Sequence, residues 1–214
     1  MVESPGEDGQ RLYKARSLFY KKIVERYAEA VNAGEQKTIP ELKFLVNPED
    51  EAVIALRQKL LQEMQLSPSP AEGVEQYRFE RDFLGFAERA FNFVQSLQKI
   101  HSELSVSFWL SPSEVVQLGV ADAFDRCILL CSLLIAGGCE TARVRVLELE
   151  GGGRHPVVAF YYKERQHLMD ASQEASALTF TGQLEEIFKS YTFEGKRVLR
   201  SAFEFNNADY NEFE

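Results

Sequence analysis

The residue types best suited to covalent chemistry lie in one short stretch of the chain. Its three cysteines, Cys127, Cys131 and Cys139, fall within 13 residues. An odd number of cysteines does not describe a disulfide framework, so we expect reduced thiols. Cys127 and Cys131 are four residues apart and would share one face of a helix, but zinc needs two further ligands that no close cysteine or histidine pair supplies. We therefore expect no metal and no cofactor.

One histidine and one aspartate border extended segments further along the chain. His155 follows three glycines and an arginine and precedes Pro156, which is typical of the end of a hairpin turn. Asp170 precedes Ser172 in a pattern that begins a turn. Taken alone, both residues have an ordinary structural interpretation.

The elements that would position these residues follow from capping signals and periodicity. Ser111 to Glu114 reads Ser-Pro-Ser-Glu, a capping box with proline at the first helical position, and predicts a short helix that stops near Gly119. The next helix starts around Asp122 and breaks at Gly137-Gly138. The period then becomes that of extended chain, which predicts a small antiparallel sheet behind the helix. Its strands are Thr141–Glu150, His155–Lys163 and His167–Asp170, followed by a helix at Gln183–Tyr191 and a strand at Arg197–Phe205.

The first hundred residues read as helices without visible chemistry. Apolar residues recur every three or four positions from Arg11 to Ala33. A second helix is expected after the cap at Asn47–Asp50, and a third from about Gly73 to His101. Five phenylalanines lie between positions 79 and 93 of this third helix, and we interpret them as core.

Composition limits the remaining function classes. Hydrophobic residues make up 45% and charged residues 27%, as in folded domains. The net charge of -9 without a basic stripe gives no site for nucleic acid. The longest uncharged apolar run, Cys127–Cys139, is too short to span a membrane, and the first ten residues lack a secretory signal. We expect a cytoplasmic protein.

We expect one compact α+β domain, with N-terminal helices packed on a core of one buried helix and the small sheet. Along the chain it would comprise a flexible N-terminus at 1–10, a helical part at 11–105, the core at 106–205 and an acidic tail at 206–214.

The order of these parts resembles the transglutaminase-like superfamily of papain-like cysteine enzymes, in particular its archaeal branch of unassigned function. In that family a cysteine begins the leucine-rich helix, and here the matching run begins at Ala123. The family's histidine opens a strand, as His155 does, and its aspartate closes the next, as Asp170 does. His155 follows Ala123 by 32 residues and Asp170 follows His155 by 15, spacings typical of the family. The resemblance covers roughly Ser111 to Ser172.

This resemblance implies the thiol chemistry of a cysteine, a histidine and an aspartate, of which the cysteine is missing here. Such enzymes place cysteine at a helix N-terminus, where the dipole favours a thiolate, beside a histidine oriented by a carboxylate. His155 and Asp170 match the orienting pair, but the methyl group of Ala123 neither attacks nor ionises. Either alanine is natural here or it is an engineered replacement of cysteine. A register shift of one helical turn, about 5.4 Å, would bring Cys127 to the position; otherwise Cys127 and Cys131 are buried apolar side chains.

The sequence therefore predicts a catalytically inactive transglutaminase-like domain that binds a protein or peptide in a groove beside Ala123. One alternative is a cysteine peptidase, amidase or acyltransferase that uses Cys127 with His155 and Asp170, and it predicts a thiol that reacts fast near neutral pH. Another is a structural subunit that assembles through its aromatic-rich helices, and it predicts an exposed apolar patch.

Overall fold

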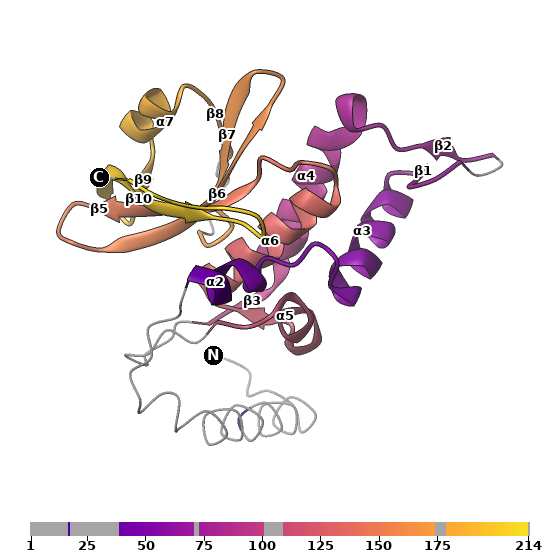
Figure 1. Cartoon of the computed structure of the whole chain (residues 1–214), viewed down its shortest axis with the longest axis horizontal. Coiled ribbons are helices and arrows are strands. Elements are labelled where there is room, and N and C mark those ends of the chain that lie inside the picture. The colour runs from indigo at the N-terminus through magenta and orange to yellow at the C-terminus, as the bar shows by residue number, and fades with distance from the viewer. Residues whose placement is uncertain (1–16, 18–38, 71–72, 101–108, 174–178, 214) are drawn as a thin grey trace, which may run out of the picture. The chain divides into compact units, whose positions relative to one another are not determined.

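The computed structural model describes residues 17, 39–70, 73–100, 109–173 and 179–213 (Figure 1). The chain forms two compact units, one of residues 1–37 with 104–106 and one of residues 38–103 with 107–214. Ser17, helical and exposed, is the one described residue of the first unit. The flexible stretch expected at 1–10 and the helix expected from Arg11 to Ala33 lie outside the described residues, Ser17 apart.

The helices of the second unit begin and end at identifiable caps. The short helix after the Ser111–Glu114 capping box is confirmed, and Gly119 ends it with φ +67°. The following helix opens with a second capping box, in which Asp122 and Asp125 each accept a backbone N–H from the other. The described helices are α2 (Ile39–Leu45), α3 (Glu51–Glu63), α4 (Phe79–Ser96), α5 (Pro112–Leu118), α6 (Ala123–Ala136) and α7 (Leu184–Ser190).

The main sheet is antiparallel throughout, with the strand order β11-β10-β5-β6-β7-β8 and β9 paired to β10. Together with the helices it confirms the α+β class. Its strands are β5 (Arg143–Leu149), β6 (Arg154–Tyr162), β7 (Arg165–Met169), β8 (Thr179–Gly182), β9 (Thr192–Phe193), β10 (Lys196–Phe205) and β11 (Tyr210–Glu212). Two short parallel pairs join β1 (Leu66–Ser67) to β2 (Glu75–Gln76) and β3 (Gln98–Lys99) to β4 (Val120–Ala121).

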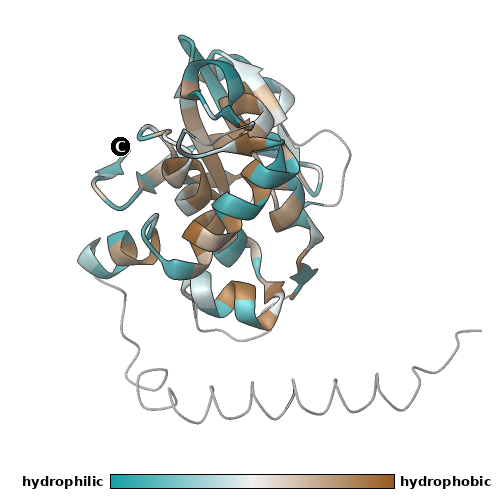
Figure 2. Ribbon diagram, turned by 90° about the vertical axis from the view of Figure 1, so that its right-hand side faces the viewer, coloured by the Kyte–Doolittle hydropathy of each residue, from teal (hydrophilic) through white to brown (hydrophobic). Residues whose placement is uncertain are grey.

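The two faces of this sheet bury two separate hydrophobic clusters. Side chains alternate between faces along a strand. Val158 and Phe160 of β6 belong to the large cluster that includes the buried residues of α6, whereas Val157 belongs to a smaller cluster with Ile187 and Tyr191. Hydrophobic residues gather where the helices meet the sheet, and hydrophilic ones lie on the outer turns (Figure 2). The alternation therefore assigns His155, two residues before Val157, to the face of the smaller cluster.

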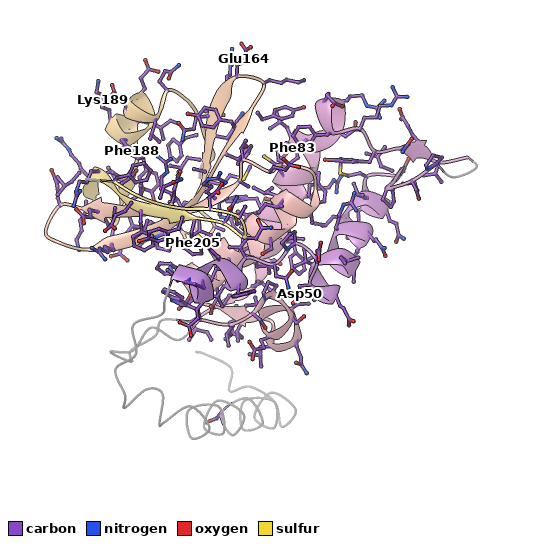
Figure 3. The ribbon with its side chains drawn as sticks, viewed as in Figure 1. Asp50, Phe83, Glu164, Phe188, Lys189 and Phe205 are labelled. Atoms are coloured by element: carbon purple, nitrogen blue, oxygen red, sulfur yellow. The ribbon has the colours of Figure 1, made fainter. Side chains whose placement is uncertain are left out.

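The aromatic residues of α4 connect the helical layer to the sheet. Phe83 is fully buried where α4 meets the sheet (Figure 3), with its ring 5.5 Å from Phe160 and 5.2 Å from Tyr162. The Tyr162 hydroxyl donates to the carbonyl of Glu80 at 2.6 Å. The phenylalanines of this helix are thus core side chains, as the sequence indicates.

The expected third helix was wrong at both ends. The chain from Val74 to Arg78 is extended because the N–H of Tyr77 bonds the carbonyl of Ser67 at 2.8 Å, which pairs β2 with β1. The carboxylate of Asp82 then takes the N–H of Arg78 and starts α4. After Ser96 the N–H of Gln98 bonds the carbonyl of Gly119, and the chain enters β3 instead of a further helical turn.

Other differences concern short elements. The helix α3 is capped by Asp50, whose side chain accepts the N–H of Ala52, while Asn47 caps only the turn before it. α2 and β8 form where no element was expected. Part of the expected acidic tail is ordered in the sheet, because Tyr210 to Glu212 pair with β10.

A buried ion pair joins β5 to β10. The guanidinium of Arg145 donates from Nε at 2.9 Å and from Nη2 at 2.5 Å to one carboxylate oxygen of Glu204. The exposed fractions of the two residues are 7% and 8%. Two register irregularities interrupt this strand pair, between Val198 and Arg200 and between Ser201 and Phe203.

Candidate functional site

His155 and Asp170 lie side by side at one end of the sheet. His155 is the second residue of β6 and Asp170 directly follows β7, and these strands are antiparallel neighbours. The imidazole Nε2 lies 3.0 Å from the carboxylate Oδ2 of Asp170. Both residues are buried, with exposed fractions of 2% and 0%. This arrangement orients the imidazole and supplies a counter-charge for its protonated form.

The carboxylate of Asp170 has more donors than the histidine alone. Its Oδ2 also accepts the hydroxyl of Tyr191 at 2.6 Å and the amide of Gln173 at 2.7 Å. Its Oδ1 accepts the N–H and the hydroxyl of Ser172, at 2.9 and 2.6 Å. Burial by itself would raise the pKa of Asp170, but the hydrogen bond and charge of His155, with the Ser172 and Tyr191 bonds, hold that pKa well below its ordinary value. Asp170 is therefore an ionised acceptor at neutral pH.

The ring of His155 is enclosed by the segment that follows β8. Phe193 of β9 stacks on it with ring centroids 3.7 Å apart and an interplanar angle of 19°. Tyr191 lies next to it, at 6.5 Å. The hydroxyl of Ser172 is 3.2 Å from Nε2. Within the described parts of the chain, the hydrogen-bonding and ring partners of His155 thus come from the end of β7 and from the α7–β9 region.

Ser172 does not complete a nucleophile–base pair. Its hydroxyl lies 2.6 Å from Oδ1 of Asp170, the shorter of its two contacts, and donates its proton to that carboxylate. A hydroxyl committed to Asp170 cannot at the same time pass its proton to His155. Ser172 is also buried, with an exposed fraction of 1%.

The sequence-predicted nucleophile position, Ala123, is the first residue of α6 and is partly exposed. The first turn of α6 is tied to the residue after Asp170, because Nη1 of Arg126 donates to the carbonyl of Ala171 at 2.9 Å. Nη2 of Arg126 donates to the carbonyl of Leu97 at 2.5 Å. These bonds fix the start of α6 near the end of β7.

Cys127 lies one turn deeper in α6 and is fully buried. Burial, and after it the negative charge of Asp170, raise its pKa well above the ordinary value of a thiol. Burial likewise raises the pKa values of Cys131 and Cys139. All three side chains are protonated at neutral pH, and the thiolate is the form that attacks.

Two acidic residues occupy the start of α6. Asp125 is buried, accepts the N–H of Leu110 at 2.8 Å, and has its pKa raised to about 7 by burial and by the nearby charge of Asp122. Beside them the rings of Trp109 and Phe124 stack with centroids 4.7 Å apart and an interplanar angle of 18°. Both aromatic residues are partly exposed, so this end of α6 presents an aromatic pair next to Ala123.

Sequence reasoning brought His155 and Asp170 together but missed Tyr191 and Phe193. The two aromatic residues lie at the end of the expected Gln183–Tyr191 helix and beyond it, and nothing in their spacing connects them to position 155. Ser172 carried a usable signal, since a hydroxyl residue two positions after an aspartate bonds back to it.

The larger surface cavities described lie elsewhere. One of about 660 Å³ is lined by residues around Phe44 and Asn207, and one of about 480 Å³ by residues around Leu66 and Val74. Neither is lined by His155, Asp170 or Ala123. Within the described ranges, no cluster of histidine, cysteine, aspartate or glutamate could hold a metal ion, and no helix has the length and apolar character needed to cross a membrane.

No protein-family model matches the chain, and no curated protein sequence is similar to it. Among solved structures it is similar to LapG of Legionella pneumophila, with a TM-score of 0.49 and 15% identity over 88% of this chain and 87% of that one. The calcium-bound form of LapG gives a TM-score of 0.47 and 14% identity over 89% and 90%. A transglutaminase structure gives 0.37 and 13%, over 83% of this chain and 44% of the other. A likeness of fold at such identities does not transfer an activity.

Proposed function

We propose that this chain is a catalytically inactive transglutaminase-like domain that binds a protein or peptide at the start of α6. The observation that carries the proposal is the side chain at the first position of α6. Ala123 offers a methyl group where the resemblance calls for a thiol, while His155 and Asp170 keep a bond of 3.0 Å. The pair is retained without a group for it to activate.

The buried thiols give little support to the enzyme alternative. Cys127 would have to move by one helical turn to take the place of Ala123. That shift would break the capping box of Asp122 and Asp125 and the bond from Arg126 to Ala171. The shift would also place at the nucleophile position the thiol of Cys127, whose pKa is raised by its surroundings, whereas an attacking thiol needs a lowered pKa.

The subunit alternative also finds little support among the described residues. The aromatic side chains it would use are inside the core, since Phe83, Phe86 and Phe91 of α4 are buried. The large hydrophobic residues that are exposed, such as Phe44 and Leu84, come from different elements.

Binding is favoured by the surface next to Ala123. The stacked pair of Trp109 and Phe124 is partly exposed, and aromatic side chains are enriched at the centres of protein interfaces. The small side chain of Ala123 lets a peptide backbone approach the helix start. Because Asp122 lies beside it, the bound segment should carry no acidic residue at this point.

A reporter thiol tests this proposal. Random displayed peptides are selected on the wild-type chain and counter-selected on Phe124→Ala. The peptides are then added to an Ala123→Cys variant, whose labelling by a fluorescent maleimide is timed. We expect the selected peptides to slow labelling at position 123.

The matched control is Glu164→Cys, which places a thiol at the exposed tip of the β6–β7 hairpin (Figure 3). Its labelling should be unchanged by the same peptides. Failure to enrich any peptide, or equal protection of both thiols, would refute binding at the start of α6.

A further inference from the structure

The segment from Gln183 to Phe193, which contains α7 and β9, covers the imidazole of His155. The contacts with the His155–Asp170 pair come from the last residues of this segment, Tyr191 and Phe193. Phe193 lies flat on the ring at 3.7 Å, and Tyr191 reaches past the ring to the carboxylate of Asp170 at 2.6 Å. Thr192, between them, is exposed, so the segment turns two aromatic side chains inward and the intervening one outward.

Apart from the backbone pairing of β9 with β10, the described contacts of this segment fall into an apolar and a polar set. Its apolar contacts belong to the smaller of the two clusters, in which Ile187 and Tyr191 pack on Leu147, Val157 and Leu168. Its polar contacts converge on Asp170, directly through Tyr191 and indirectly through Gln173, whose amide also lies 3.4 Å from the carbonyl of Thr192. The exposed fraction of Asp170 is 0%, so these bonds form away from competing water.

The C-terminal end of the segment is a tight turn. Thr192 and Phe193 pair with Arg197 and Lys196, which leaves Glu194 and Gly195 as a two-residue loop. Their φ angles are +50° and +77°, the sign pattern of a type I′ hairpin. The turn places Phe193 opposite the imidazole and gives the segment a fixed end on β10.

We propose that residues 183–193 form a latch over His155 and Asp170, and that a bound peptide releases the latch by putting an aromatic side chain in the place of Phe193. This inference rests on the proposed function. The flat contact of Phe193 with the imidazole defines the group that a ligand must supply, because only another planar ring restores the same stacking. The partner is therefore a protein segment with an exposed aromatic residue.

The latch has a direct consequence for the reactivity of His155. Both described hydrogen bonds of its ring are made by Nε2, so acylation would occur at Nδ1, provided that the reagent can enter. Diethyl pyrocarbonate acylates exposed imidazoles, and mass spectrometry of the digested protein assigns the modified site. His167 is an internal reference, because it is buried against Phe160 on a different part of the sheet.

The test compares the acylation rate of His155 in Tyr191→Phe and Phe193→Ala with that in the wild type. Tyr191→Phe keeps the ring and removes the bond to a buried charge, so the chain should remain folded while the rate rises by about tenfold. Phe193→Ala should give at least a comparable rise. The wild-type rate should be slow and should match that of His167.

The matched control is Phe188→Ala, which removes a ring from the same small cluster on α7 (Figure 3) without removing either contact to the pair. Its effect on the rate should be much smaller than that of Phe193→Ala. Fast acylation in the wild type, or equal acceleration in Phe188→Ala, would overturn the latch, since release would not depend on the contacts at His155 and Asp170.

Peptide binding separates the latch from the proposed function. If both hold, peptides selected on the wild type contain an aromatic residue, and they bind Phe193→Ala several-fold more tightly because less energy is spent on opening. Peptides that protect position 123 but bind the latch variants unchanged would leave the proposed function standing and reject the latch. Latch variants that acylate faster while no peptide binds would reject the proposed function and release by a peptide, and would leave only the covering contacts at His155 and Asp170 standing.

Discussion

Tyr191 and Asp170, 21 residues apart in the chain, share a hydrogen bond of 2.6 Å in which the phenol donates to Oδ2 of the carboxylate. Burial, and after it the charge of Asp170, raise the pKa of Tyr191, so the phenol remains a donor throughout the physiological range. The same oxygen takes the imidazole of His155. Because Asp170 binds both His155 and Tyr191, the histidine–aspartate pair contributes to the stability of the fold.

Asp170→Asn should lower the free energy of unfolding by about 3–5 kcal/mol near neutral pH, since it removes the charge from a buried pair. The folded-state pKa of Asp170 lies below its unfolded value of about 4, so its contribution is present above that pH and is lost as the pH falls. Urea denaturation of both chains should show the difference shrinking in acid.

Asp209→Asn is the control for this change. Asp209 pairs with Arg143 at 2.9 Å, but its side chain is 57% exposed. Its removal should cost less than about 1 kcal/mol at any pH. A difference for Asp170→Asn that persists unchanged into acid would contradict an ionised Asp170.

The three cysteines should react slowly with iodoacetamide in the native chain. Cys127, Cys131 and Cys139 are buried, and burial raises the pKa of each thiol. Labelling followed by mass spectrometry should accelerate only in denaturant. Rapid alkylation of Cys127 alone under native conditions would revive the enzyme alternative and remove the basis of the proposed function.

Asp125→Asn should become more stable relative to the wild type as the pH rises. The pKa of Asp125 is raised to about 7 in the folded chain, so the folded state holds a proton that the unfolded state releases near pH 4. Wild-type stability from this group is therefore complete below about pH 4 and is lost as the pH rises through 7.

Asparagine at position 125 keeps an oxygen for the N–H of Leu110 but loses the acceptor for the N–H of Asp122, a cost that does not vary with pH. The charge is therefore tested by the change of the stability difference with pH. Asp122, whose own pKa is influenced by the charge of Arg126, also faces the group, and both residues remain in both chains. Parallel stability curves for the two chains between weakly acidic and weakly basic pH would show that Asp125 is ionised throughout.

Glu164→Gly should stabilise the chain by about 0.5–1 kcal/mol, because it relieves a left-handed backbone at a residue with a Cβ. Tyr162 pairs with Arg165, which leaves Lys163 and Glu164 as a two-residue hairpin loop with φ of 48° and 62°. Glu164→Ala removes the same carboxylate but keeps the Cβ and should give no gain. Thermal unfolding of the three chains distinguishes relief of the backbone from loss of charge.

The sequence predicted those elements that carry their own start and stop signals. The capping box at Ser111 and the glycines after Ala136 bracket α5 and α6 in sequence and in structure. The pattern failed where a distant partner decides the conformation. Tyr77 lies within the helix expected from Gly73, but its N–H is taken by the carbonyl of Ser67.

The residues of the candidate site likewise fall into those that local signals predict and those that distant partners position. His155 lies at the start of β6 and Asp170 directly follows β7, and a short hairpin joins these two strands, so their approach follows from local pattern. Tyr191 and Phe193 reach them through a separate helix and a second hairpin, and no periodicity encodes that return. The sequence therefore predicts the His155–Asp170 pair of the candidate site, but not Tyr191 and Phe193, which enclose it.

The ion pair of Arg145 and Glu204 has a bearing on how the chain avoids misfolding. The two residues are 59 positions apart, so no turn sets the alignment of their strands. If one strand shifted by a single residue, Glu204 would point to the opposite face of the sheet. The guanidinium of Arg145 would then remain buried without its counter-charge. Such a mispaired intermediate loses about 3–5 kcal/mol, more than the correct pair gains over an apolar one. The two charges thus act chiefly as a penalty on wrong alignments.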